Sequence, residues 1–150
     1  MKKEQFMKEA IAEALSAKAQ GEVPIGAVVV YENRIIGRGH NTRQTTQQAT
    51  HHAEIKAIEH ACETLGSWRL EDCDLYVTVE PCPMCAGAII MSRMRSVIYG
   101  TTEQKMGAHQ SVIDLFDAPF NHKVGVESGV CADECKTLLQ DFFKKLRQKT

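Results

Sequence analysis

The chain has 150 residues, of which 43% are hydrophobic and 25% are charged, and its formal net charge at pH 7 is -1. This composition excludes a disordered chain, a fibrous repeat and a coiled coil, and the length is typical of one domain with a single compact core. Because 18 Lys and Arg balance 19 Asp and Glu, a nucleic acid would have to bind a local basic patch.

The first predicted element is an amphipathic helix over residues 4–20. Apolar side chains recur there at intervals of three and four, and Gly21 stands where such a helix ends. Glutamates interrupt the apolar pattern, which argues against a signal peptide, and no later stretch of 18 apolar residues could span a membrane. We therefore expect a cytoplasmic protein with no membrane partner.

Two apolar segments follow, at residues 25–31 and 34–40, and the short polar link between them predicts a β-hairpin. Neither segment alternates strictly between apolar and polar side chains, so we expect the sheet to be covered on both faces. Residues 41–50 are polar and are predicted to form a loop, of a length that is often functional.

The rest of the chain alternates between predicted helices and strands. A helix begins near His52 and stops at Gly66. The later predictions are a strand at 73–80, a helix at 83–94, a strand at 96–100, a short helix at 111–116, a strand near 123–127 and a helix at 132–148. This order predicts an α/β fold, with a mixed sheet and helices on both faces, in a single domain over residues 1–150.

Cys82 and Cys85 lie three residues apart at the predicted start of a helix, where both sulfurs can face one point. This spacing suits a redox pair and a metal site about equally. A four-cysteine zinc site would need a second pair, and Cys131 with Cys135 lacks the usual spacing. We expect reduced thiols, with Cys62, Cys131 and Cys135 as small buried side chains, and Cys73 as a loop thiol.

His52 and Glu54 decide between these alternatives. His52 would complete a set of three zinc ligands with Cys82 and Cys85, leaving the fourth position for a water whose pKa the metal lowers to about 7. Glu54, near the metal without binding it, could then transfer protons. His-x-Glu alone is uninformative, but followed by Pro-Cys-x-x-Cys it is the signature of zinc-dependent base deaminases. Neighbouring His51 is outside this pattern.

The resemblance extends beyond the motif to almost the whole chain. The segments GEVPIGAVVV, HAE, LGSWRLEDCDLYVTVEPCPMCAGAI, NHKV and DECKTLLQDFFKKLRQ resemble those of bacterial tRNA-specific adenosine deaminases, members of the zinc-dependent cytidine/deoxycytidylate deaminase superfamily. The resemblance implies a cytidine-deaminase-like three-layer α/β/α fold with a mixed five-stranded sheet. It also implies a homodimer with one Zn2+ per chain, which hydrolytically deaminates the wobble adenosine (position 34) of a tRNA anticodon stem-loop to inosine.

The resemblance further implies residue roles. Zinc-activated hydroxide would attack C6 of adenine while Glu54 moves the protons. Asn41 would read the base edge, although by itself it is more typical of a turn, and the backbone at Ala53 and Pro81 would frame the pocket. RNA contacts are expected from Lys105 and from the tail, at Phe142, Phe143, Lys144, Lys145 and Arg147. The tail read alone predicts an amphipathic last helix with both phenylalanines in the core.

Two features depart from that family. The chain has ATHHAE where a PTAHAE-like run is usual, and KMGAHQSV where smaller residues are usual, so substrate details could differ. The alternative functions are a guanine or cytosine deaminase, since the zinc motif does not specify the base, and a non-enzymatic zinc-stabilised RNA-binding domain. Glu54 distinguishes the binding domain from an enzyme, because a domain that only binds RNA has no use for a carboxylate beside an open zinc position.

Overall fold

The computed structural model describes residues 2–149, so positions 1 and 150 of the predicted domain lie outside the described residues. Its helices are α1 (Lys3–Ala19), α2 (Arg43–Thr46), α3 (Ala53–Leu65), α4 (Pro83–Met91), the 3-10 turn η1 (Leu115–Asp117) and α5 (Ala132–Gln148). Its strands are β1 (Gly26–Tyr31), β2 (Arg34–His40), β3 (Cys73–Val79), β4 (Ser96–Thr101) and β5 (Gly125–Ser128).

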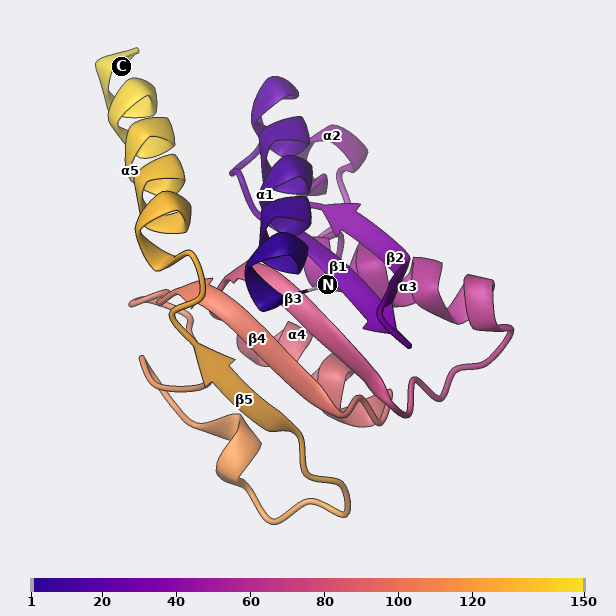
Figure 1. Cartoon of the computed structure of the whole chain (residues 1–150). Helices are drawn as coiled ribbons and strands as arrows, with labels where there is room; N and C mark the ends of the chain where they lie inside the picture. Colours follow the sequence, from indigo (N-terminus) through magenta and orange to yellow (C-terminus); the bar gives the residue numbers. More distant parts are fainter. Residues whose placement is uncertain (1, 150) are drawn as a thin grey trace.

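The five strands form one mixed sheet in the order β2-β1-β3-β4-β5 (Figure 1). Strand β1 is antiparallel to both of its neighbours, whereas β3, β4 and β5 run parallel to one another. The parallel half is connected through α4 and through η1 and its flanking loops, as the crossover rule for parallel strands requires. The predicted mixed sheet is confirmed.

Alternate residues of the strands face two separate apolar cores, which makes the fold three-layered. On one face, side chains of β1, β3 and β4 pack against α1 and the start of α5; this core is Phe6, Met7, Ala10, Ile11, Val28, Val30, Tyr76, Ile98 and Cys135. The other face packs against α3 and α4, and its strand members include Ala27, Val29, Leu75, Val77, Val97 and Tyr99. The expectation of helices on both faces is confirmed.

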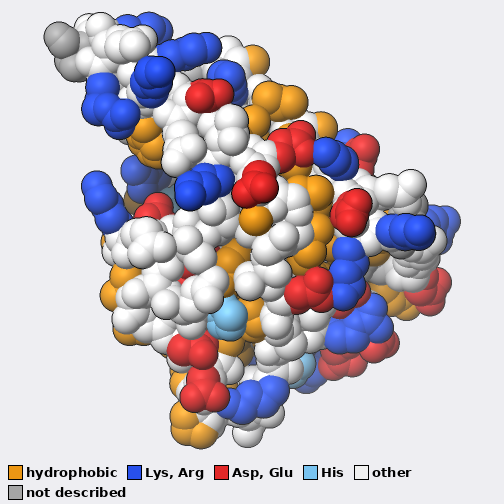
Figure 2. Space-filling view, turned by 60° about the vertical axis from the view of Figure 1, so that its left-hand side comes forward, with side chains coloured by type: hydrophobic (Ala, Val, Ile, Leu, Met, Phe, Trp, Pro, Cys, Tyr) orange, Lys and Arg blue, Asp and Glu red, His pale blue; other side chains and the backbone are white. Residues whose placement is uncertain are grey.

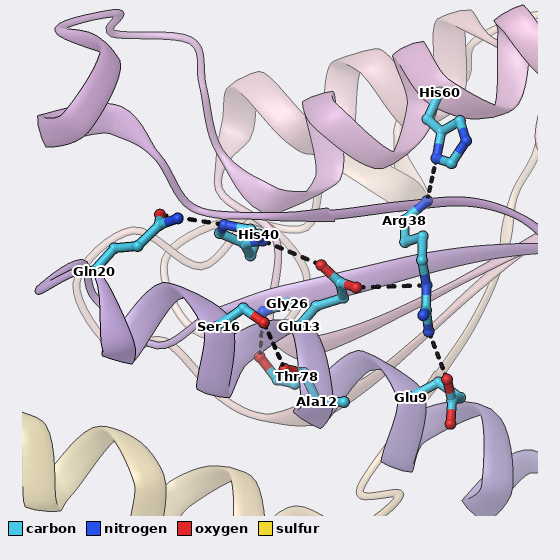
Figure 3. A network of polar contacts seen from close by, with 10 residues as sticks. All are labelled: Glu9, Ala12, Glu13, Ser16, Gln20, Gly26, Arg38, His40, His60 and Thr78. Carbon is cyan, nitrogen blue, oxygen red and sulfur yellow. Dashed lines mark hydrogen bonds and ion pairs between the residues drawn. The ribbon is translucent and has the colours of Figure 1, made fainter.

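A polar network fixes β2 between two helices (Figure 3). The Arg38 guanidinium lies 2.6 Å from Glu9 and 3.4 Å from Glu13 of α1, while its backbone N–H donates to His60 of α3 at 3.0 Å. His40 contacts Glu13 at 3.1 Å. Partly exposed pairs of this kind stabilise by about 0–1 kcal/mol each, so the network orients α1 and α3 more than it stabilises the fold. His40 and His60 thus have structural contacts in this network.

Four local expectations are wrong. The 41–50 loop contains the one-turn helix α2, and of the helix expected at 111–116 only the start of η1 forms. Helix α4 ends at Met91 rather than at residue 94, because Arg93 adopts a left-handed φ of 66° that no α-helix continues through. Cys73 is no loop thiol: it begins β3 and is fully buried.

Helix α5 extends past the edge of the sheet (Figure 1), and Cys135 is its buried residue. Phe142 is half-buried and Phe143 is 39% exposed. The tail is a helix, as its pattern predicts, but the expectation that both phenylalanines lie in the core is wrong. Within residues 2–149, no helix is both long enough and apolar enough to cross a membrane.

Candidate active site and metal centre

The two segments that carry the metal-ligand candidates each change from extended chain to helix at the candidate residue. His52 is the N-cap of α3 and Cys82 is the N-cap of α4, both with extended backbone angles. Pro83 favours the start of α4 because its fixed φ suits the first helical position. Cys85 lies in the first turn of α4, so both helix N-termini bring ligands to one point.

His52, Cys82 and Cys85 form a group that could hold a metal ion, with their ligand atoms all within 4.8 Å of one another. His52 Nδ1 lies 3.5 Å from the Cys82 sulfur and 3.6 Å from the Cys85 sulfur. For a tetrahedral zinc with Zn–S about 2.3 Å and Zn–N about 2.0 Å, the N and S donors lie about 3.5 Å apart. The observed spacing and the donor set therefore fit zinc.

The pKa shifts of the candidate ligands are unequal, and only that of Cys82 favours the deprotonated form that a cation binds. A hydrogen bond with Cys85 lowers the pKa of the Cys82 thiol to about 4, with help from His52. The same bond, together with burial, raises the pKa of Cys85. The two thiols and the imidazole therefore share protons through hydrogen bonds. A cation that bound to their S and N atoms would displace those protons.

Glu54 lies in the first turn of α3, one residue beyond Ala53, and is 4% exposed. Burial raises the pKa of Glu54 to about 7, and the charge of Cys82 acts in the same direction. A carboxyl group in such surroundings can both accept and release a proton near neutral pH. Glu54 is outside the group of ligand atoms that could hold the metal.

A cleft of about 460 Å3 opens over this centre. Its wall combines residues from six separate stretches of the chain: Val23, Ile25, Asn41, Arg43, Ala49, His52, Ala53, Glu54, Val79, Glu80, Cys82, Pro83, Met84, Glu103, Met106 and Phe143. The candidate metal ligands and Glu54 therefore lie at a pocket large enough for a small heterocycle.

The candidate substrate-binding residues differ in their relation to this cleft. Asn41 lines it, and its side chain also forms a turn by accepting a hydrogen bond from Arg43 N–H at 3.2 Å and donating to Val23 O at 3.4 Å. Ala53 lines the cleft as well. Pro81 is buried beside the cleft lining, and its carbonyl accepts a hydrogen bond from Ala108 N–H.

The residues expected to contact RNA come from two places. Phe143 lines the cleft, and Phe142 meets it edge-to-face with ring centroids 5.4 Å apart. Lys144, Lys145 and Arg147 lie on the exposed part of α5, and Figure 2 shows Lys and Arg side chains gathered where this helix ends. Lys105 is exposed in the loop after β4, next to Met106 of the cleft wall.

Sequence reasoning missed Arg43, Glu80, Glu103 and Met106, all of which line the cleft. The position of Glu80 directly before Pro-Cys was a usable signal, because an acidic residue at the end of an apolar strand needs a buried partner. Arg43 begins α2 and the other two lie in the loop after β4, and the convergence of these segments is a tertiary feature without a sequence pattern. The second histidine, His51, bonds Thr46 at 2.8 Å and is outside the ligand group.

A buried carboxylate beside a His/Cys/Cys group, at the starts of two helices, is the arrangement of metal-dependent base deaminases. Comparison with known families agrees with this class. The model of the MafB19-like deaminase family matches residues 1–147.

Curated relatives narrow the assignment. A tRNA-specific adenosine deaminase of Bacillus subtilis (strain 168) is 50% identical over 147 residues, covering 97% of this chain and 91% of the relative. One of Aquifex aeolicus (strain VF5) is 45% identical over 148 residues, covering 98% and 97%. The chain therefore belongs to the MafB19-like deaminase family and, within it, to the family of tRNA-specific adenosine deaminases.

Solved structures agree with this placement. A chain from studies of A-to-I editing by tRNA deaminases at the wobble position of transfer RNA superposes with a TM-score of 0.87 at 45% identity, covering 90% of this chain and 99% of that one. A guanine deaminase from Bacillus subtilis gives a TM-score of 0.65 at 34% identity, covering 81% and 88%. The fold is thus shared with purine-base deaminases of more than one specificity.

Proposed function

We propose that residues 1–150 form a single zinc-dependent deaminase domain that converts the wobble adenosine, position 34, of a tRNA anticodon to inosine. One observation carries the proposal: His52, Cys82 and Cys85 meet beside the buried Glu54 in one cleft, in a chain 45–50% identical to tRNA-specific adenosine deaminases. The net reaction exchanges the amino group of adenosine for oxygen, consuming water and releasing ammonia.

Zinc is the proposed metal, because the donor set and the spacing of His52, Cys82 and Cys85 fit it. When bound there, zinc supplies a Lewis acid that lowers the pKa of a coordinated water from about 15.7 to about 7. The protein contributes the geometry. Two helix N-termini hold His52 and Cys82, and their partial positive charge favours the deprotonated ligands.

Glu54 is the proposed proton carrier. Its carboxyl group accepts a proton from water and delivers it to the ring nitrogen of adenine. It then moves a proton to the departing amino group, so that ammonia is released. Burial in the cleft wall keeps Glu54 away from bulk solvent, and this allows one carboxyl group to act in both directions.

The remaining cleft residues are proposed to bind the base. Asn41 is held by its two backbone contacts, and the remaining hydrogen-bonding capacity of its amide is proposed to read the base edge. The backbone near Ala53 and Pro81 frames the pocket, and the apolar side chains of Ile25 and Val79 cover the ring faces and exclude water.

The proposed partner is the anticodon stem-loop of a tRNA. Phe143 at the mouth of the cleft, with Phe142 against it, offers aromatic surface on which an unstacked base can rest. Lys144, Lys145 and Arg147 follow on the same helix and would meet phosphates, and Lys105 would do so from the loop after β4. We propose a cytoplasmic location because that is where tRNA and reduced thiols are found together.

We also propose that two copies associate through the face formed by the end of α4 and the η1 region. Met91 and Phe120 line one shallow hollow there, and they are 68% and 50% exposed. Apolar side chains gathered on a surface in this way mark protein interfaces.

The test compares substrates under identical conditions. The purified zinc-loaded protein is incubated with an anticodon stem-loop RNA that has adenosine at the wobble position and, separately, with free guanine and free cytosine. We expect kcat/KM to be larger for the RNA. Turnover of guanine alone would favour the second candidate, which the guanine deaminase superposition supports. RNA binding without any turnover would indicate a binding domain.

A further inference from the structure

Glu80 is a second buried carboxylate at the cleft, 2% exposed and two residues before the metal-ligand candidate Cys82. Five donors from one loop surround it. Its Oε1 accepts hydrogen bonds from Glu103 N–H at 3.0 Å and from the Ser111 hydroxyl. Its Oε2 accepts the N–H groups of His109 and Gln110 at 2.9 Å and of Ser111 at 3.1 Å.

The loop of residues 103–111, called here the clamp loop, is closed around this carboxylate. Gly107 N–H donates to Glu103 O at 2.8 Å, and Ala108 N–H donates to Pro81 O at 2.9 Å. A Cβ atom at Gly107 would lie 2.3 Å from Cδ of Glu80. Only glycine therefore lets the clamp loop approach the carboxylate this closely.

The clamp loop also forms one side of the cleft. Glu103 and Met106 line it, and Lys105 between them is exposed. Secondary structure does not hold this loop: between β4 and η1 the chain has turns alone. The bonds to Glu80 and Pro81 thus attach a substrate-facing loop to the same turn that presents Cys82.

We propose that Glu80 is a positioning residue for substrate binding, because its carboxylate holds the clamp loop as a preformed wall of the cleft. This inference rests on the proposed function. Without the carboxylate, the loop amides would be left with no acceptor, and substrate binding would have to order the loop first. The expected loss is therefore in binding and not in the chemical step.

The test uses Glu80→Gln in the full zinc-loaded chain. Glutamine keeps the shape but offers one acceptor oxygen, so at least one loop N–H would face an NH2 group in either orientation. We expect KM for the anticodon stem-loop RNA to rise about 10-fold, with kcat within about 3-fold and zinc content unchanged. Amide hydrogen exchange should accelerate in residues 103–111 while the rest of the sheet keeps its protection.

Gly107→Ala adds a Cβ atom on the clamp loop where it contacts the Glu80 carboxylate. This variant should likewise raise KM and leave kcat nearly unchanged. The matched control is Gly125→Ala in β5, where the added Cβ meets its nearest atoms at an ordinary 3.7 Å. Since both test substitutions act on the packing of one loop against one carboxylate, the double variant should raise KM by no more than about the larger of the two single effects.

Ser111→Ala removes a single hydroxyl donor and should raise KM less than Glu80→Gln does, because the four backbone N–H donors remain.

Unchanged KM and unchanged loop exchange in Glu80→Gln would overturn the inference. So would equal losses in kcat and zinc content, because Glu80 would then support the metal site itself. Fully additive effects of Glu80→Gln and Gly107→Ala would show that they act separately. Failure of the proposed function is distinct: the unsubstituted protein would then form no inosine, while loop exchange could still respond to Glu80→Gln.

Discussion

Three buried glutamates lie near the cleft, and their surroundings give them different properties. Burial raises the pKa of Glu54 to about 7. Burial acts in the same direction on Glu22 and Glu80, but hydrogen bonds from Thr45 and Gln44 to Glu22, and from Ser111 and the loop amides to Glu80, outweigh it and hold each pKa below its ordinary value. Glu22 and Glu80, whose charged forms are favoured, organise loops, and Glu54 is the one suited to proton transfer.

Replacing Glu54 tests this division at the residue scale. Glu54→Ala should lower kcat for inosine formation by about 100-fold or more, since a positioned proton carrier contributes at least that much. Zinc content, measured by plasma mass spectrometry, should remain near one per chain because the ligands are untouched. Loss of zinc together with activity would show that Glu54 supports the metal and would contradict its assigned role.

Glu22 provides a pH-dependent contribution to stability. Its carboxylate accepts hydrogen bonds from the backbone and hydroxyl of Thr45 at 2.6 Å and from Gln44 N–H at 3.2 Å, which attaches α2 beside the cleft. Its pKa is lower in the folded chain than the ordinary value of 4.5. The stability that this provides is therefore present above pH 4.5 and is lost as the pH falls through the lower folded value.

Glu22→Gln should consequently reduce the free energy of unfolding by about 1–3 kcal/mol at pH 7. The difference from the unsubstituted protein should shrink as the pH is lowered below 4.5, when Glu22 itself becomes protonated. Urea unfolding at a series of pH values measures it. The control, Glu71→Gln, changes an exposed carboxylate paired with Arg69 and should have little effect at any pH. A pH-independent loss in Glu22→Gln would refute the explanation.

At the scale of elements, sequence pattern predicted β1, β3, α3 and the start of α4 well because each has a strong local signal. Gly66 stops α3 with a left-handed φ of 65°, and Pro81 separates β3 from α4. The pattern failed where structure depends on other segments. Helix α2 is a single turn that relies on Glu22, more than 20 positions earlier in the chain, and no local periodicity reports such an interaction.

Helix α5 shows that local sequence pattern does not predict burial either. Its apolar side chains predict a buried face, but the helix extends beyond the sheet and leaves Phe143 at the cleft. Whether the apolar face of a helix is buried depends on how far the sheet beneath it extends. The sequence of the helix itself carries no information on that length. The exposed remainder carries the side chains that we propose for RNA binding.

The basic side chains of α5 should contribute to RNA binding through phosphates. The double substitution Lys144→Ala with Lys145→Ala should raise KM for the stem-loop RNA and reduce the slope of log KM against log salt by about 0.7 for each phosphate that is no longer neutralised. Arg34→Ala, at the end of β2 remote from the cleft, should leave both quantities unchanged. Equal salt slopes for the double variant and the unsubstituted protein would exclude a role for these lysines at the phosphates.

At the scale of the whole molecule, the proposed pairing of two chains can be measured directly. Analytical ultracentrifugation should find a dimer at micromolar concentration, and Met91→Glu should yield a monomer because it adds a charge to the exposed apolar hollow. Leu15→Glu, on the opposite face at 48% exposure, is the control and should remain dimeric. A monomeric unsubstituted protein, or a Met91→Glu dimer of equal strength, would contradict this interface.

The sequence could predict the candidate ligands of the metal centre but not the complete cleft. His52, Cys82 and Cys85 follow a motif because His52 and Cys82 each cap a helix and Cys85 lies in the first turn of the second one, and this constraint is local. Arg43 of α2, and Glu103 and Met106 of the loop after β4, reach the cleft only through the tertiary arrangement of these connecting segments. Those loops are also where substrate choice among related deaminases would be determined.

This chain is expected to make inosine at one position of a tRNA. The most direct test is mass mapping of nuclease fragments from a whole tRNA with adenosine at position 34, after incubation with the zinc-loaded protein. We expect inosine in the anticodon fragment and unchanged adenosine in every other fragment. Inosine spread over many fragments, or no inosine while free guanine is deaminated, would contradict the claim.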